Sequence, residues 1–357
     1  MRKIAVPAGA EGLVIAERYQ PLATSPGFKS AAAFCAEYQP LSYAIEPIVR
    51  SASLYTITAR TGAGKTAFQI VAALAIATGR QDILGVEVSR GRVAYLAFEN
   101  PDDARMRFKI AAYLLNIDLA ELADDLVILD ARLKPEEVLA KLDAMAMQRP
   151  FSLILVDTLA AWFDGDNIND NVQGGEFMRR IRPLTRISGL PSVLVAAHPV
   201  KNASEENLVP YGGGAILNEV DGNLCLAKQA DTGLVTLHWQ GKLRGLEFKP
   251  IYFRFEITGS PEVIDAKGRQ VQLPTLRPSA EEFAEERHDA EINIKVALLK
   301  AMLEEPTGTQ TTWGAAIGRT KSNVNRKLQA MAKEKLVEVT LGKWSITPKG
   351  KTAVPGA

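Results

Sequence analysis

Short apolar runs alternate with longer segments of helical periodicity through the first two thirds of the chain. The run LYTITA at 54–59 precedes a helix predicted over 65–78, and RVAYLAF at 92–98 precedes a helix predicted over 102–115. Strands that alternate with helices predict an α/β fold with a mainly parallel central sheet. Four more runs are apolar on consecutive positions, as strands covered on both faces require; they lie at 126–129, 152–157, 192–197 and 223–228.

The same pattern divides the chain into four parts. Residues 1–40 mix Pro, Gly and Ala without a sustained period and are interpreted as an N-terminal extension, and the α/β core follows at 41–257. Residues 258–287 carry Pro, Gly and acidic side chains, which predicts a linker. Residues 288–350 hold three predicted helices and then a β-hairpin, which is the order of a winged helix-turn-helix domain.

Composition and charge narrow the function classes. Of the 357 residues, 47% are hydrophobic and 23% are charged, which is typical of a folded globular protein. The formal net charge is only +1, so a nucleic-acid contact has to come from a local patch. Such a patch is present at the C-terminal end, because residues 288–351 contain 11 Lys and Arg against 6 Asp and Glu.

Cysteine and histidine usage argues against metal-stabilised or disulfide-linked folds. The two cysteines, Cys35 and Cys225, lie far apart, and only three histidines are present, so we expect neither a zinc site nor a disulfide framework. No apolar run reaches the roughly 18 residues that a bilayer requires, and the first residues lack the apolar core of a signal peptide. We therefore expect a cytoplasmic protein without a membrane partner.

A phosphate-binding motif follows the first strand of the core. Residues 59–66, ARTGAGKT, match the Walker A pattern G-x-x-x-x-G-K-[ST] except that Ala59 replaces the first glycine. Backbone N–H groups and a helix N-terminus surround phosphates in this motif, while Lys65 adds a charge and Thr66 a hydroxyl for Mg²⁺. A chance glycine-rich turn is the alternative. The motif predicts a P-loop that binds ATP and Mg²⁺ through Thr61, Gly62, Ala63, Gly64, Lys65, Thr66 and Ala67.

Three polar residues follow later strands at the edge where ligands of parallel sheets bind. Asp157 closes the run SLILVD and is predicted to hold Mg²⁺, with a helix cap as the alternative. Glu99 follows RVAYLAF and is a candidate base that orients the attacking water; its alternative role is to cap the helix near Asp102. His198 follows SVLVAA and is a candidate sensor of the γ-phosphate or a plain turn residue.

The motifs ARTGAGKT, YLAFEN, LILVDTL, AAHPVKN, YGGGAILNEVDGNLCL and WQGKLRG, in this order, resemble the RepA-like branch of RecA-fold hexameric ATPases. The best-known members of this branch are plasmid replicative helicases, and the resemblance covers residues 40–257. It implies a RecA-like P-loop NTPase core, a hexameric ring and water activation by Glu99. It also implies that His198 and Lys201 couple the nucleotide state to DNA loops.

The resemblance assigns a further role to Lys242 and Arg244. In the family, such a Lys-x-Arg pair on a late hairpin reaches the γ-phosphate bound by the neighbouring subunit, so Arg244 would be an arginine finger that acts in trans. A solvated hairpin tip is the alternative reading of these two residues. The loop at 201–216 is polar and glycine-rich, and its Lys201 is expected either to contact the DNA backbone or to lie on a plain surface loop.

The basic C-terminal segment supplies the second candidate DNA contact. Its third helix is the candidate recognition helix, and the hairpin forms the wing. The candidate DNA-binding residues are Lys321, Asn323, Arg326 and Lys327 on the helix and Lys343 on the wing. Winged helices also dock proteins, so protein binding is the alternative role.

These observations lead to one main functional hypothesis and two others. The first is an ATP-hydrolysing, ring-forming DNA motor, a RepA-like replicative helicase that acts on single-stranded DNA. The second is a regulatory or recruitment ATPase that binds duplex DNA through the winged helix and does not unwind it. A small-molecule kinase is the third, and both the lack of an evident lid and the basic C-terminal segment argue against it.

Overall fold

The computed structural model describes residues 28–200, 203, 207–229, 232–279, 281–340 and 342–354, apart from the side chains of 213 and 281–291. The chain divides into two units, at residues 1–42 and 43–357. The described part of the first unit contains the short helix α1 (Ala31–Ala36), which Ser30 caps by accepting a hydrogen bond from the Ala33 N–H. Among the described residues, no helix is both long enough and apolar enough to cross a membrane.

A nine-stranded sheet forms the centre of the second unit, in the order β11-β10-β9-β8-β3-β7-β6-β4-β5. The strands from β8 to β5 in this order are parallel to one another, and β9, β10 and β11 continue the sheet antiparallel. The predicted α/β fold with a mainly parallel sheet is therefore confirmed. The strands are β3 (Leu54–Ala59), β4 (Arg92–Ala97), β5 (Leu126–Leu129), β6 (Phe151–Asp157), β7 (Ser192–Ala197), β8 (Gly222–Lys228), β9 (Leu234–Leu243), β10 (Ile251–Ile264) and β11 (Gln270–Pro278).

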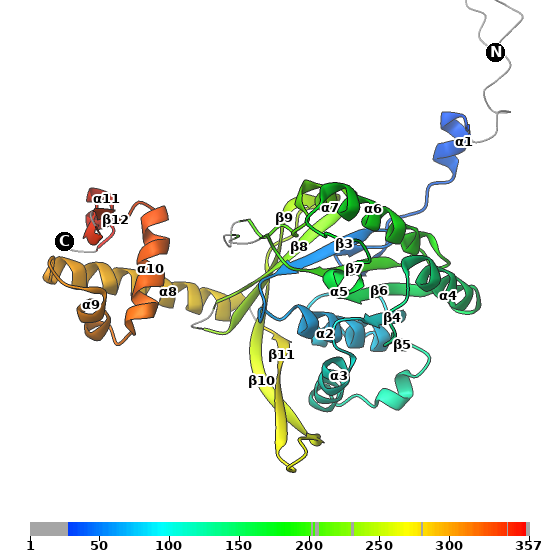
Figure 1. Cartoon of the computed structure of the whole chain (residues 1–357), viewed down its shortest axis with the longest axis horizontal. Helices are drawn as coiled ribbons and strands as arrows, with labels where there is room; N and C mark the ends of the chain where they lie inside the picture. Colours follow the sequence, from blue (N-terminus) through cyan, green and yellow to red (C-terminus); the bar gives the residue numbers. More distant parts are fainter. Residues whose placement is uncertain are drawn as a thin grey trace, which may run out of the picture. The chain divides into compact units, whose positions relative to one another are not determined.

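Helices cover both faces of the sheet (Figure 1). Helices α2 (Lys65–Thr78) and α3 (Pro101–Leu115) lie on one face, and α4 (Pro135–Gln148) and α6 (Asn171–Ile181) on the other. The α/β core also contains shorter elements: β1 (Tyr43–Ile45), β2 (Val49–Arg50), α5 (Leu159–Trp162), α7 (Gly213–Glu219) and the 3₁₀ turns Gln81–Ile83, Leu119–Leu122 and Arg182–Arg186.

The strand residues alternate between two hydrophobic cores. On β6, Leu153 and Leu155 join the core beneath α2, whereas Ile154 and Val156 join the core beneath α4 and α6. Side chains alternate along a strand, so a run that is apolar on consecutive positions can fill both cores. All six residues of β3 are buried for this reason, and the P-loop that follows β3 starts from a rigid support.

The linker predicted at 258–287 is wrong. Residues 258–278 belong to the β10–β11 hairpin, and α8 starts at Glu281, so the core extends to Pro278 and not to residue 257. The hairpin packs on α2 through the edge-to-face contact of Phe253 with Phe68, whose ring centroids are 5.8 Å apart. Its Pro and polar residues fit because β11 is an edge strand, where proline costs no ladder hydrogen bond.

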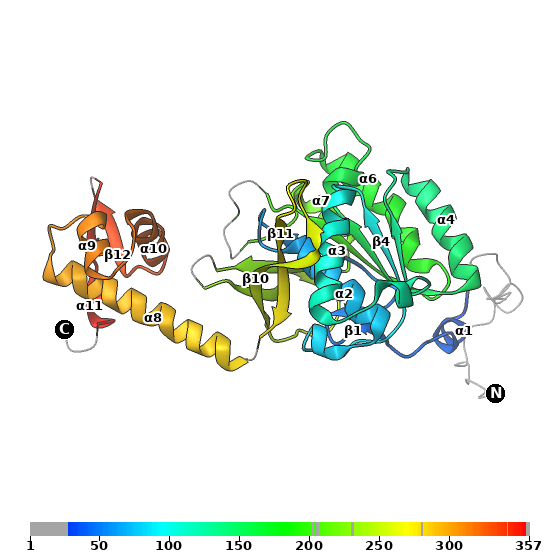
Figure 2. The same ribbon diagram turned by 90° about the horizontal axis from the view of Figure 1, so that it is seen from below.

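The C-terminal elements have a core of their own. Figure 2 shows the smaller elements gathered around the second half of α8 (Glu281–Glu304). Buried residues such as Leu298, Trp313, Leu328 and Trp344 form this core. The other elements are α9 (Gln310–Ala316), α10 (Lys321–Lys333), β12 (Val337–Thr340), β13 (Lys343–Ile346) and α11 (Pro348–Thr352). The winged-helix assignment of residues 288–350 stays a prediction.

Candidate active site

The loop between β3 and α2 has the backbone of a phosphate cradle. Gly62 and Gly64 have φ angles of 77° and 103°, in the left-handed region that favours glycine, and α2 begins at Lys65. Ala59 is the last residue of β3 and pairs with Leu226 of β8, so its backbone is extended. The first position of the motif therefore does not require a glycine here, which explains why Ala59 is accepted.

The side chain of Lys65 lies inside this loop. It is 7% exposed, and its Nζ donates to the carbonyl oxygen of Ala59 over 2.8 Å. Burial lowers the pKa of Lys65 to about 8, while the charges of Asp157 and Glu99 act in the opposite direction. A phosphate group in the cradle would supply the counter-charge that this buried ammonium lacks.

Thr66, Asp157 and Tyr95 form a hydrogen-bonded group behind the loop. Thr66 Oγ1 donates to Asp157 Oδ1 over 3.3 Å, and the Tyr95 hydroxyl donates to Asp157 Oδ2 over 2.7 Å. Burial raises the pKa of Asp157, and these two hydrogen bonds oppose the rise. Burial beside Asp157 also raises the pKa of Tyr95 well above its ordinary value, so this hydroxyl is a donor at neutral pH.

These oxygens fit Mg²⁺, which prefers hydroxyl, carboxylate, phosphate and water ligands. Thr66 and Asp157 present a hydroxyl and a carboxylate oxygen side by side. Within the part of the chain that the structure describes, no group of three or more His, Cys, Asp and Glu side chains is arranged so that it could hold a metal ion by itself. Phosphate oxygens and water would therefore have to supply the remaining ligands, as in sites that bind a metal together with a nucleotide.

Glu99 lies beside this group. Its backbone N–H donates to the carbonyl oxygen of Asp157 over 2.9 Å, and its charge partly opposes the lowering of the Lys65 and His198 pKa values that burial causes. Its side chain is exposed and therefore open to a ligand. Glu99 is not the N-cap of α3, which was its alternative role. The N-cap is its neighbour Asn100, which accepts a hydrogen bond from the Asp103 N–H over 3.0 Å.

His198 lies on the same edge, with a partner that sequence reasoning missed. Burial and the charge of Lys65 lower the pKa of His198, while Glu99 opposes them. The Tyr211 N–H donates to the His198 carbonyl oxygen over 2.9 Å, and the ring centroids lie 6.3 Å apart. The signal that marks Tyr211 in the sequence is its position directly before Gly212–Gly214. Lys201 lies outside the described residues.

Two cavities border the P-loop. One of about 300 Å³ lies beside β8 and is lined by residues 60–63, Leu208 and residues 226–228. The other, of about 600 Å³, is lined by Arg60, Thr61, residues 198–200 and Ala203. The first cavity reaches the size at which pockets hold small ligands. The β10–β11 hairpin borders this region, because Lys228 Nζ lies 3.1 Å from the ring centroid of Phe255.

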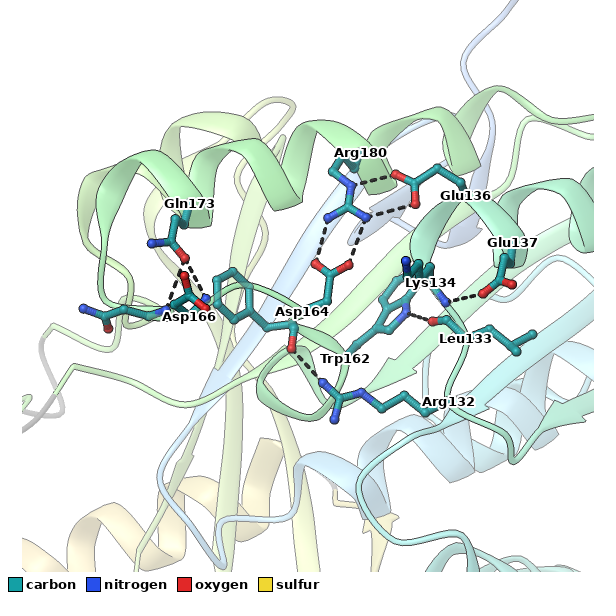
Figure 3. Close-up of polar contacts among 12 residues, drawn as sticks. Arg132, Leu133, Lys134, Glu136, Glu137, Trp162, Asp164, Asp166, Gln173 and Arg180 are labelled. Atoms are coloured by element: carbon teal, nitrogen blue, oxygen red, sulfur yellow. Dashed lines mark hydrogen bonds and ion pairs between the residues drawn. The ribbon is translucent and has the colours of Figure 1, made fainter.

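The segment that follows Asp157 is held by a polar network (Figure 3). Arg180 pairs with both Asp164 and Glu136, over 2.7 and 2.6 Å, and its hydrogen bonds lower the pKa of Glu136 to about 2. Trp162 Nε1 donates to the Leu133 carbonyl oxygen over 2.9 Å. The Trp162 ring also packs on Phe98, the residue before Glu99. The network therefore fixes the ends of the two strands that carry Glu99 and Asp157.

Lys242 and Arg244 lie away from this group. Lys242 Nζ donates to the Asn218 carbonyl oxygen over 2.6 Å, and Arg244 Nη1 donates to Asp221 Oδ1 over 2.9 Å. The Leu54 N–H donates to Asp221 Oδ2, and the Asp221 N–H donates to the Leu54 carbonyl oxygen. Leu54 is the first residue of β3, whereas the P-loop follows the last residue of that strand. A strand of this length spans about 17 Å, so the structure does not bring Arg244 to the P-loop of its own subunit.

The C-terminal candidates occur on α10 and on β13. Lys321 and Arg326 are exposed, and the apolar side of the same helix, with Val324 and Leu328, faces the core. Asn323 is half-buried; its N–H donates to Oγ1 of the cap residue Thr320, and its Oδ1 accepts a hydrogen bond from Arg326. Lys327 is half-buried and Lys343 is exposed.

Comparison with known proteins gives one finding. A family model described as an AAA domain matches residues 20–204, just over half of the chain. The match includes the P-loop, Glu99, Asp157 and His198, and it ends before Lys242 and Arg244. The search of curated proteins gave no match.

Proposed function

Since this chain belongs to the AAA domain family and is a nucleotide-binding ATPase of the AAA type, we propose that it hydrolyses ATP with Mg²⁺ to drive a motor on DNA. The family match also confirms the resemblance to the RepA-like ATPases. The finer proposal is a ring-forming helicase of the replicative kind that acts on single-stranded DNA.

The observation that carries the proposal is the convergence of Lys65, Thr66, Asp157 and Glu99 at one end of the parallel strands. Lys65 and the loop N–H groups would bind the β- and γ-phosphates, and Thr66 and Asp157 would hold Mg²⁺. When bound, Mg²⁺ supplies charge neutralisation on the phosphates. Glu99 would orient the attacking water and accept its proton, with His198 close to the γ-phosphate.

A second copy of the chain completes the proposed site. Charge develops on the γ-phosphate oxygens during transfer, and an arginine from a neighbouring subunit stabilises this charge. The support is that Arg244 lies at the opposite end of β3 from the P-loop of its own subunit. Contacts that join one end of a subunit to the other end of the next are heterologous and can close into a ring. We propose six subunits from the resemblance to the hexameric RepA-like ATPases.

DNA is the proposed substrate of the motor. The surplus of Lys and Arg in residues 288–351 supports backbone contacts by Lys321, Arg326, Lys327 and Lys343, with Asn323 as the proposed base contact. Lys201 is proposed to contact single-stranded DNA from its loop. Phosphate contacts of this kind give binding that weakens as salt rises.

The second candidate function is a regulatory or recruitment ATPase. The observation in its favour is the separate C-terminal core, which would let the basic segment keep its fold while it binds duplex DNA. In this case the nucleotide sets only the oligomeric state.

A strand-displacement assay on a tailed duplex separates the two functions. ATP-dependent release of the labelled strand, lost in Lys65→Ala, supports the motor. ATP-dependent duplex binding without release favours the regulator. Absence of ATP turnover in the unaltered protein, with and without DNA, contradicts both.

A further inference from the structure

The carboxylate of Asp157 has a different partner on each oxygen. Oδ1 accepts from Thr66, on the side of the P-loop, and Oδ2 accepts from Tyr95 over the shorter distance of 2.7 Å. Asp157 is 5% exposed and Tyr95 is 0% exposed, so little water competes with the second hydrogen bond. The two oxygens are therefore distinguished by the fold, and only Oδ1 adjoins the hydroxyl of Thr66.

The sheet register fixes this arrangement. Strand β4 lies beside β6, with Ala97 paired to Asp157 and Tyr95 paired to Leu155. Residues two apart on a strand point to the same face, so Tyr95, which is level with Leu155 and thus two residues before Asp157, lies on the same side of the sheet as Asp157. The Tyr95 ring is held there by Phe108 of α3, in an edge-to-face contact with centroids 5.0 Å apart.

We propose that Tyr95 is a positioning residue for the metal site, which holds Asp157 Oδ2 so that Oδ1 stays directed at Thr66 and at the metal. The inference rests on the proposed Mg²⁺ and nucleotide site. A carboxylate with one free oxygen can turn about its last side-chain bond, and a fixed donor on Oδ2 removes this freedom. Hydrogen-bond partners of metal ligands of this kind change metal affinity by about 10- to 100-fold when they are removed.

The test compares two conservative variants. Tyr95→Phe removes only the hydroxyl, and Tyr55→Phe is the matched control. Tyr55 is 1% exposed on β3, and its hydroxyl accepts a hydrogen bond from the Arg50 N–H, away from the P-loop. Both variants lose one buried hydroxyl, so a general effect of this loss on packing is expected in both.

The main readout is binding and not turnover. The affinity for a fluorescent ADP analogue is measured across a Mg²⁺ titration and again in EDTA, and Mn²⁺ binding to the ADP complex is followed by EPR. In Tyr95→Phe we expect the metal concentration for half-maximal effect to rise about 10-fold, with unchanged affinity in EDTA. In Tyr55→Phe we expect the same metal concentration for half-maximal effect as in the unaltered protein.

A metal titration of Tyr95→Phe that matches the unaltered protein overturns the inference and leaves the proposed function standing. If the unaltered protein shows no metal-dependent tightening of ADP binding, the proposed function fails, and the inference with it. A second measurement uses ¹³Cζ-labelled tyrosine, which reports on the hydroxyl directly, and the Tyr95 resonance is identified by its absence in Tyr95→Phe. We expect the Tyr95 resonance to shift when Mg²⁺ is added to the ADP complex, and an unchanged resonance overturns the inference.

Discussion

Arg244 is bound to Asp221 at the end of β3 opposite to the P-loop, with 2.9 Å between Nη1 and Oδ1. Asp221 is 5% exposed and also accepts hydrogen bonds from the Leu54 N–H and from Arg182. The Arg244 side chain is 59% exposed, and a guanidinium has five donors, so donors remain for another ligand. A guanidinium that is already held in place loses less freedom when it contacts a phosphate.

Arg244→Ala is expected to lower ATP turnover by about 10³-fold, because the charge that develops on the γ-phosphate loses its partner. Nucleotide affinity of the single subunit is expected to change little. The matched control is Arg269→Ala, since Arg269 is an exposed arginine paired with Asp265 at the tip of the β10–β11 hairpin. Mixing Arg244→Ala with Glu99→Gln should restore part of the turnover, and failure of every mixing ratio would argue against a shared site.

Lys65→Ala is expected to lower nucleotide affinity and to reduce turnover by about 100-fold or more, because the charge that faces the phosphates is lost. The free protein should not be destabilised by this change. Burial lowers the pKa of Lys65 to about 8, so below that pH the folded protein carries a buried charge that is unfavourable. Thermal unfolding with and without ATP and Mg²⁺ measures both effects, and equal nucleotide protection of variant and unaltered protein would be inconsistent with the proposed site.

Two substitutions in the P-loop test the backbone argument. Ala59→Gly is expected to leave ATP affinity within about twofold of that of the unaltered protein. Ala59 has an extended backbone that any residue can adopt, so the wider φ range of glycine brings no advantage there. Gly62→Ala has open space around its Cβ but has to adopt a φ of 77°, which costs about 1–2 kcal/mol and is expected to lower affinity about 10-fold. Calorimetric titration with ATP and Mg²⁺ measures both, and a reversed order would disprove the backbone reading.

The sequence was sufficient to predict the parallel part of the sheet, because a run that is apolar on consecutive positions has one main solution, a strand covered on both faces. The P-loop was predicted because its residues are adjacent in the chain. Glu99 and Asp157 could be placed at one edge because parallel strands end together. These predictions depend on local pattern and on sheet geometry.

The features that were missed depend on partners far away in the chain. The β10–β11 hairpin has the composition of a linker, and only its contacts, such as Phe253 on Phe68, reveal it as part of the core. The hydrogen bond between Tyr95 and Asp157 joins residues 62 positions apart. Tyr95 in an apolar run is equally consistent with plain core packing, so its polar role required the register of β4 against β6.

The two cysteines are expected to differ in reactivity. Burial raises the pKa of the Cys225 thiol to about 12, whereas Cys35 is exposed. The thiolate is the reactive form, so at pH 8 iodoacetamide should modify Cys35 and spare Cys225 in the folded protein. Mass spectrometry of the intact protein should show one adduct under native conditions and two in denaturant. Native labelling of Cys225 at the rate of Cys35 would contradict the buried β8 position.

Removal of residues 281–357 is expected to weaken DNA binding and to flatten its salt dependence, since each lost phosphate contact lowers the slope of log K against log salt by about 0.9. The cut falls before α8 and leaves the β10–β11 hairpin with the core.

Lys321→Ala should reproduce part of the effect of the truncation on the salt dependence. Lys295→Ala removes the same charge from the same segment but takes it from an ion pair with Glu334, so it should leave the slope unchanged. Equal slopes for Lys321→Ala and Lys295→Ala would mean that the net charge of the segment, and not the surface of α10, determines DNA binding. An unchanged slope after the truncation would mean that residues 281–357 do not contact DNA.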